Sequence, residues 1–240
     1  MIKSLSIIFP LYNEIRRIEM SLIKIEEFLI NNNFNNIEII LVNDGSTDAT
    51  QKIIYKFVKN SKFKNLFKIL IFKQNRGKGF ALKSGIKIAS NDWILTTDID
   101  HSVPLKQVNE WNNKFIKKNK NVYFGSRTHP KSQVKKNLMR NLLGYFFVKL
   151  TYLIFDINIS DTQCGFKLYK KKVAKKLFSN LKELGYVHDV EIAHNCLINN
   201  IKITELPVKW QHKKFGKVNI LIDPFIMFIS LLILKIKLYQ

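Results

Sequence analysis

The fold class is decided by the stretch Glu38-Ile39-Ile40-Leu41-Val42-Asn43-Asp44-Gly45-Ser46-Thr47-Asp48. Its first half is a short apolar run, which is typical of a buried β-strand. Its second half is a polar turn with a glycine, and residues 47–60 continue with the spacing of a helix. The stretch is therefore one strand–turn–helix unit.

The first half of the chain repeats this unit. Residues 5–9, 68–72, 93–97 and 122–126 form further short apolar runs, and helical stretches reach to about residue 31, cover 78–89 and start near 104. Short apolar strands that alternate with helices predict an α/β fold, with a mostly parallel central sheet and helices on both faces. Sites in such sheets lie beyond the carboxyl ends of the strands.

Polar and charged side chains follow each predicted strand. In chain order they are Tyr12-Asn13-Glu14, Asn43-Asp44, Asn75-Arg76-Gly77-Lys78-Gly79, Asp98-Ile99-Asp100 and Arg127. Because the ends of parallel strands meet at one edge, these groups are expected to gather there.

The second half of the chain has two apolar stretches. Residues 138–155 are apolar at helical spacing, interrupted by Lys149, which favours a buried or interfacial helix over a membrane span. Residues 218–234 are strongly apolar but contain Asp223 and Pro224. We expect this second stretch to lie at a membrane interface or to be re-entrant; a core helix and a true span are the alternatives.

Composition limits the partners. Lys and Arg number 40 against 18 Asp and Glu, and the formal net charge is +22. Such a charge favours anionic lipid, phosphorylated substrates or nucleic acid, although it also arises from a general abundance of Lys. Zinc-ligand spacing and RNA-recognition aromatic motifs are both missing, so nucleic acid is not expected. The two cysteines suit a reducing compartment, and no signal peptide is recognised at the N-terminus.

Asp98 and Asp100 are the candidate metal ligands. They lie two residues apart at the end of a predicted strand, and oxygen ligands of this kind suit Mg²⁺ or Mn²⁺ together with phosphate oxygens. A solvated acidic turn is the alternative interpretation.

Two other segments are open to a simpler interpretation. The loop 75–79 precedes a helix and could hold phosphate through backbone N–H groups, or be an ordinary turn. Asp189 and Glu191 open a helical stretch, where acidic residues favour the helix N-terminus whatever their function.

Taken in order, these motifs resemble the family-2 inverting glycosyltransferases with a GT-A fold. Within that family the chain is similar to the dolichyl-phosphate β-glucosyltransferases, which are relatives of the dolichyl-phosphate mannose synthases. The resemblance runs from about Ser6 to Trp210, and its motifs are 9–14, 42–48, 75–79, 97–100, 125–129 and 161–168. The last two, Gly-Ser-Arg-Thr-His and Asp-Thr-Gln-Cys-Gly-Phe-Lys-Leu, indicate the glucosyl branch.

The resemblance implies a role for each matching residue. Nucleotide binding is implied for Pro10, Tyr12, Glu14, Asp44, Lys78 and Asp98, with Asp44 at the uracil. The resemblance also implies a divalent cation at Asp98 and Asp100, catalytic roles for Asp161, Asp100 and Arg127, and an acceptor-side position for Asp189 and Glu191. Arg127 and Arg140 match positions that hold phosphate groups, the acceptor phosphate among them. Asn43 departs from the family, which usually has aspartate there.

The implied reaction moves a hexose, glucose from UDP-glucose, to a polyprenyl phosphate with inversion. GDP-mannose as donor and a glycan as acceptor are the alternatives. The acceptor is already ionised, so no strong base is required. We expect residues 1–215 to form the transferase domain, residues 216–240 to form an interfacial segment, and the enzyme to bind an anionic membrane surface on its cytosolic face.

Overall fold

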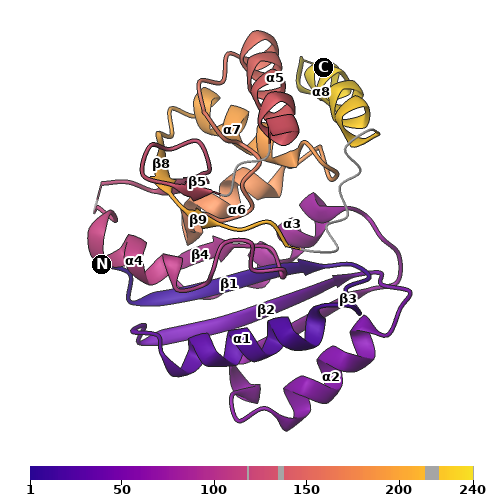
Figure 1. The fold of residues 1–240 in the computed structure, drawn as a ribbon, viewed down its shortest axis with the longest axis vertical. Helices are drawn as coiled ribbons and strands as arrows, with labels where there is room; N and C mark the ends of the chain where they lie inside the picture. The colour runs from indigo at the N-terminus through magenta and orange to yellow at the C-terminus, as the bar shows by residue number, and fades with distance from the viewer. Residues whose placement is uncertain (118, 135–137, 214–221, 240) are drawn as a thin grey trace.

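The structure is a computed structural model that describes residues 1–117, 119–134, 138–213 and 222–239, without the side chains of residues 138–143, 223 and 239. Its centre is a seven-stranded sheet with the order β3-β2-β1-β4-β7-β5-β8 (Figure 1). The strands are β1 (Ser4–Leu11), β2 (Asn36–Asp44), β3 (Phe67–Phe72), β4 (Trp93–Thr96), β5 (Val122–Ser126), β7 (Lys167–Lys170) and β8 (Ile203–Pro207). All pairings are parallel except those of β7, which is antiparallel to both β4 and β5. The predicted α/β fold with a mostly parallel sheet is confirmed.

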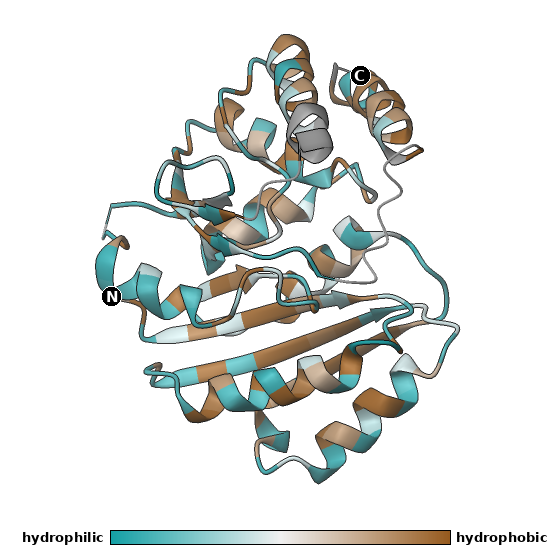
Figure 2. Ribbon diagram, viewed as in Figure 1, coloured by the Kyte–Doolittle hydropathy of each residue, from teal (hydrophilic) through white to brown (hydrophobic). Residues whose placement is uncertain are grey.

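Helices cover both faces of the sheet because β1 and β2 are apolar on both sides. Leu5, Ile7 and Phe9 of β1 belong to one apolar core, while Ile8 belongs to the other, as alternation along a strand requires. The first core is closed by α1 (Ile18–Ile30), α2 (Thr50–Asn60) and α4 (Gln107–Lys114). The second is closed by α3 (Lys78–Ile88), α6 (Lys171–Ser179) and α7 (His188–Ile198). Figure 2 shows the hydrophobic residues of the strands between these layers.

Smaller elements complete the fold. A short 3-10 helix, η1 (Lys64–Leu66), precedes β3, and β6 (Gln133–Val134) pairs in parallel with β9 (Lys209–Trp210). Strand β7 was not predicted, because its sequence Lys-Leu-Tyr-Lys has a lysine at each end. The first of these lysines, Lys167, is nevertheless only 1% exposed.

Helices α5 (Leu138–Phe155) and α8 (Asp223–Tyr239) pair with each other at the edge of the second core (Figure 1). The helix predicted for residues 138–155 is confirmed. In the second apolar stretch, Asp223 and Pro224 begin the helix and do not interrupt it, which agrees with the preference of proline for a first turn. Residues 218–221 and the expected domain boundary at 215/216 lie outside the described residues.

Helix α8 is buried on one side only. Leu231 and Leu234 are fully buried in the second core, whereas Phe225, Ile229 and Ile236 are exposed. On α5, Tyr145, Phe146, Tyr152 and Leu153 are exposed. Within the part of the chain that the structure describes, neither helix reaches the length and apolar character that crossing a membrane requires.

Candidate functional site

The predicted site residues gather at the carboxyl edge of the sheet. Pro10 and Asp44 are among the last residues of strands β1 and β2, and most of the other predicted residues follow a strand end or lie in the first turn of a helix. Asn13, with a φ of 49°, ties the first two loops together. Its side-chain oxygen accepts a hydrogen bond from the backbone N–H of Thr47 at 2.8 Å, and its own N–H donates to Ser46 Oγ at 2.9 Å. The loops after β1 and β2 therefore form one surface.

Asp44 organises the basic loop after β3. Its carboxylate accepts hydrogen bonds from the backbone N–H groups of Arg76 at 3.1 Å and Gly77 at 2.8 Å. Burial raises the pKa of Asp44 more than these hydrogen bonds lower it. Gly77 has a φ of 100°, and a Cβ there would lie 2.2 Å from the carbonyl oxygen of Leu184, so this turn requires glycine. The turn places Lys78 at the start of α3.

Lys78 and Asp98 form a close ion pair, with 2.6 Å between Nζ and Oδ1. Burial by itself would raise the pKa of Asp98, but the Lys78 ammonium outweighs it and holds the pKa of this carboxyl below its ordinary value. Gly165 backs the same carboxylate, since a Cβ at that position would lie 2.3 Å from Oδ2 of Asp98. Asp98 is thus an ionised carboxylate held between a lysine and a glycine.

Asp100 faces an arginine that the sequence analysis did not single out. Nη1 of Arg17 lies 3.6 Å from Oδ2 of Asp100, and the other oxygen of Asp100 accepts a hydrogen bond from the backbone of Ser102 at 2.8 Å. The Nε and Nη2 groups of Arg17 bind the carboxylate of Glu14. Glu14 and Arg17 are three residues apart, a spacing that brings side chains together within one turn and could have revealed the pair.

Arg127 and Asp161 are paired with each other. Arg127 donates to Asp161 through Nε at 2.7 Å, through Nη2 at 2.8 Å and through its backbone N–H at 2.9 Å. The backbone N–H groups of Gln163 and Cys164 donate to the same carboxylate. Burial works against ionisation, but the guanidinium prevails and lowers the pKa of Asp161.

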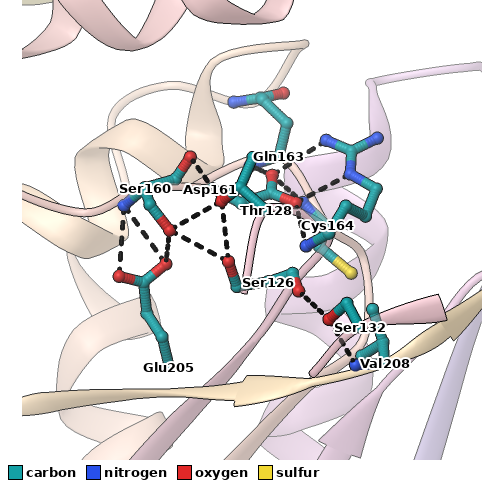
Figure 3. A network of polar contacts seen from close by, with 10 residues as sticks. Ser126, Thr128, Ser132, Ser160, Asp161, Gln163, Cys164, Glu205 and Val208 are labelled. Carbon is teal, nitrogen blue, oxygen red and sulfur yellow. Dashed lines mark hydrogen bonds and ion pairs between the residues drawn. The ribbon is translucent and has the colours of Figure 1, made fainter. Parts of the chain in front are cut away.

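The surroundings of Asp161 are polar and connected, as Figure 3 shows. Ser126 Oγ lies 2.9 Å from Ser160 Oγ, and Ser160 Oγ donates to Glu205 at 2.5 Å. This network joins strand β5, strand β8 and the loop that precedes β7. The network therefore fixes the position of Arg127 and Asp161 relative to the rest of the carboxyl edge.

Asp189 and Glu191 point into the protein. Asp189 accepts a 2.6 Å hydrogen bond from the buried ammonium of Lys167, and Nε2 of His188 lies 3.3 Å from the same oxygen. Glu191 accepts hydrogen bonds from the backbone N–H groups of Lys182 and Glu183. The loop so held packs on the basic loop, because Gly79 N–H donates to Leu184 O at 2.8 Å. Glu191 thus holds the segment that packs on the basic loop, while Asp189 pairs with the buried Lys167.

Two predictions, on Arg140 and on the metal site, find no direct support among the described side chains. Arg140 lies in α5, but its side chain is not among those described. Across the described chain, no group of three or more His, Cys, Asp or Glu side chains is arranged as a metal site. Asp98 and Asp100 still suit a cation such as Mg²⁺, which takes one or two protein carboxylates and completes its shell with phosphate oxygens and water.

Comparison of the sequence with known proteins gives consistent matches. Residues 6–178 match glycosyl transferase family 2. The chain is 33% identical over 246 residues to a dolichyl-phosphate beta-glucosyltransferase of Saccharomyces cerevisiae, covering 96% of this chain and 74% of that protein. It is 30% identical over 224 residues to the Homo sapiens protein of the same name, covering 87% of this chain and 67% of that protein.

Solved structures resemble the fold. Glucosyl-3-phosphoglycerate synthase from Mycobacterium tuberculosis, crystallised with Mn²⁺, UDP and glucosyl-3-phosphoglycerate, aligns with a TM-score of 0.70 at 14% sequence identity. The alignment covers 97% of this chain and 80% of that one. At this identity the likeness concerns the arrangement of the elements.

Proposed function

Because the chain belongs to glycosyl transferase family 2, we propose that it transfers glucose from UDP-glucose to a dolichyl-type polyprenyl phosphate with inversion at the sugar. The relatives named dolichyl-phosphate beta-glucosyltransferase support the sugar and the acceptor. The single observation that carries the proposal is the set of ion pairs after the strand ends, in which Lys78 pairs with Asp98, Arg17 with Asp100, and Arg127 with Asp161.

Asp98 and Asp100 are the residues that would hold Mg²⁺ or Mn²⁺. When bound, such a cation supplies charge that stabilises the diphosphate leaving group. The ionised state of Asp98 and the oxygen-only donor set support this assignment. The structure of glucosyl-3-phosphoglycerate synthase with Mn²⁺ and UDP is a related case of the same fold.

The nucleotide would lie against the loops after β1, β2 and β3. Pro10, Tyr12, Glu14 and Asp44 lie in or beside these loops, and Lys78, at the start of α3, would meet a phosphate. Asn43 is buried, and its Nδ2 atom has no hydrogen-bond partner among the described atoms. An amide donor at this place would serve base or ribose recognition.

On the acceptor side, Arg127 and Arg140 would bind the lipid phosphate, with Asp161 close to the sugar. The phosphate attacks as an anion, so the protein needs to position it and does not need to remove a proton. The hydrogen bonds that Asp161 accepts from Arg127 and from backbone N–H groups fix its carboxylate in place, which suits a group that orients the sugar. Asp189 and Glu191 would not contact the acceptor directly. Asp189 would position Lys167, and Glu191 would position the loop at Leu184.

The acceptor's polyprenyl tail requires the enzyme to work at a membrane surface, and we place it on the cytosolic face. Helices α5 and α8 pack on each other, and each carries exposed apolar side chains, including Tyr145, Leu153, Phe225 and Ile236. Lys172, Lys175 and Lys176 of α6 add positive charge that anionic lipid would attract.

An assay of purified full-length protein tests the proposal. The protein is incubated with Mn²⁺, polyprenyl phosphate and either UDP-glucose or GDP-mannose, and lipid-linked sugar and released nucleotide are measured. We expect UDP release and a β-linked glucosyl lipid phosphate, with Asp100→Ala reducing the rate by at least about a hundredfold while the circular dichroism melting curve stays close to wild type. Release of GDP alone would replace glucose by mannose, and turnover close to wild type in Asp100→Ala would refute the metal assignment.

A further inference from the structure

Each aspartate of the proposed metal pair is already in contact with a protein cation. Nζ of Lys78 lies 2.6 Å from Oδ1 of Asp98, and Nη1 of Arg17 lies 3.6 Å from Oδ2 of Asp100. The two cations come from different parts of the fold, since Lys78 begins α3 and Arg17 precedes α1. The carboxylate pair is therefore neutralised from both sides in this state.

Arg17 holds an unusual position. Two of its nitrogens are bound to Glu14, and the third, Nη1, is buried without a hydrogen-bond partner among the described atoms. Leaving a buried guanidinium nitrogen unbonded is costly. The carboxylate of Asp100 lies beside Nη1, but its Oδ2 atom is 3.6 Å away, which is too far for a hydrogen bond. Nη1 can therefore donate a hydrogen bond to another anionic oxygen.

Other cations near the site are bound elsewhere. Arg127 makes a bidentate pair with Asp161, and Lys167 is buried on Asp189. Arg76 stacks its guanidinium over the ring of Phe80, 3.8 Å from the ring centroid. Lys78 and Arg17 each lie within 4 Å of one carboxylate of the aspartate pair.

We propose that Arg17 and Lys78 are resident counter-ions of Asp98 and Asp100, which leave the carboxylates for the nucleoside diphosphate when a divalent cation binds. The inference rests on the proposed function. A divalent cation at the carboxylates would repel an ammonium and a guanidinium so close to them, whereas a diphosphate brings the negative charge that both can bind. Arg17 is then a positioning residue that links the nucleotide loop at Glu14 to the metal pair.

This exchange makes the binding of metal and nucleotide cooperative. Without nucleotide, the cation competes with Arg17 and Lys78 for the carboxylates, so it binds weakly. With nucleotide, the released side chains gain new partners, so each ligand strengthens the binding of the other by the same factor. Removing either side chain should therefore tighten metal binding alone and weaken the coupling.

The test measures Mn²⁺ binding to the full chain by electron paramagnetic resonance, with and without UDP and in the absence of sugar and acceptor. We expect Arg17→Gln and Lys78→Met each to bind Mn²⁺ alone about tenfold more tightly than wild type. UDP should strengthen Mn²⁺ binding to wild type several-fold more than to either variant. Arg17→Lys, which keeps the charge, should resemble wild type.

Two controls separate this effect from others. Arg16→Gln removes the same charge from an exposed neighbouring position and should leave Mn²⁺ binding unchanged. Because Arg17→Gln also removes the two hydrogen bonds that Arg17 donates to the Glu14 carboxylate, the double variant Glu14→Gln/Arg17→Gln is measured too, and it should keep the tighter binding. Thermal melting confirms that each variant is folded.

The outcomes distinguish the inference from the function on which it rests. Equal Mn²⁺ affinity in wild type, Arg17→Gln and Lys78→Met, with the same response to UDP, would overturn the counter-ion exchange and leave the metal assignment standing. Tight binding that disappears in the double variant would assign the effect to Glu14 and overturn the role of Arg17. A failure of every form to bind Mn²⁺, even with UDP, would overturn both the exchange and the proposed metal site.

Discussion

Gly165 leaves the space that the carboxylate of Asp98 occupies. A Cβ at position 165 would lie 2.3 Å from Oδ2 and 2.8 Å from Cγ of Asp98, so any side chain there must displace the carboxylate. Asp98 is also held by Lys78, and a displaced carboxylate would break that 2.6 Å ion pair. Gly165 thus contributes to the site by the room that its missing side chain leaves for the carboxylate.

We expect Gly165→Ala to lower turnover by at least about tenfold, because a shift of the Asp98 carboxylate misplaces a group that must be held within a fraction of an ångström. The measurement is glucosyl transfer together with Mn²⁺ affinity in the presence of UDP. Gly144→Ala is the matched control, since a Cβ there meets nothing within 4 Å. It should keep wild-type turnover and gain a little helix stability. Equal turnover in the two variants would show that Asp98 tolerates displacement.

Which site residues could be found from sequence depends on where their partners lie. Asp98 and Asp100 stand out because both occur in one short motif after a strand. The pairing of Arg127 with Asp161 joins residues 34 positions apart, and that of Lys78 with Asp98 joins two separate loops. No local pattern encodes such contacts. For this reason the sequence indicated which groups reach the edge, but not that Arg127 and Asp161 neutralise each other.

At the level of the elements, Glu38 of β2 joins three strands and the segment before β4 at the end of the sheet opposite the site. It accepts hydrogen bonds from Ser6 Oγ of β1 and from the backbone N–H of Ser90, before β4, and it pairs with Lys68 of β3 at 2.6 Å. Burial by itself would raise the pKa of Glu38, but the Lys68 ammonium and these hydrogen bonds bring it to about 2.

A carboxyl group whose pKa is lower in the folded state stabilises the fold at pH values above its unfolded-state pKa. The folded carboxyl has a pKa of about 2 against 4.5 for the ordinary group, so the contribution is complete above about pH 4.5 and is lost as the pH falls towards 2. We expect Glu38→Gln to lower the free energy of unfolding by about 2 kcal/mol at pH 7. The difference from wild type should shrink between pH 4.5 and pH 3.

Urea unfolding at several pH values measures this difference. Glu27→Gln, which removes an exposed carboxylate from α1, is the control and should change stability by less than about 0.5 kcal/mol. A difference between Glu38→Gln and wild type that stays constant down to pH 3 would mean that the charge of Glu38 does not stabilise the fold.

The elements themselves follow from sequence where a single segment decides them. Strands β1 to β5 and helix α5 are apolar runs with clear periodicity and were predicted. Strand β7 is set by its position between β4 and β5, which buries Lys167 against Asp189, and its sequence alone does not show this. The start of α8 at Asp223 and Pro224 was predicted as an interruption, because the same dipeptide begins a helix or breaks one depending on what precedes it.

For the whole molecule, the proposed membrane-binding face rests on the distribution of apolar side chains and charge. The net charge is +22, and α5 and α8 expose apolar side chains although they pack on each other and on the second core. Lys235 of α8 donates to the carbonyl oxygen of Ile154 in α5 at 2.6 Å, so the pair of helices is fixed as a unit. An apolar surface beside many lysines is suited to an anionic leaflet.

We expect the full chain to sediment with vesicles that contain phosphatidylserine and much less with neutral phosphatidylcholine vesicles. Replacing two exposed apolar residues of α8 in Phe225→Ser/Ile236→Ser should reduce binding to the anionic vesicles by at least about tenfold. Each of these side chains, when partly buried in the bilayer, contributes on the order of 1 kcal/mol to the binding free energy. Tyr55→Ser removes an exposed aromatic from α2, away from this face, and should leave vesicle binding unchanged. Turnover on a short-chain, water-dispersed acceptor should be close to wild type in all these variants, since the substitutions lie outside the carboxyl edge. If Phe225→Ser/Ile236→Ser binds anionic vesicles as wild type does, the charge alone holds the protein at the surface, and the apolar face of α8 has another partner.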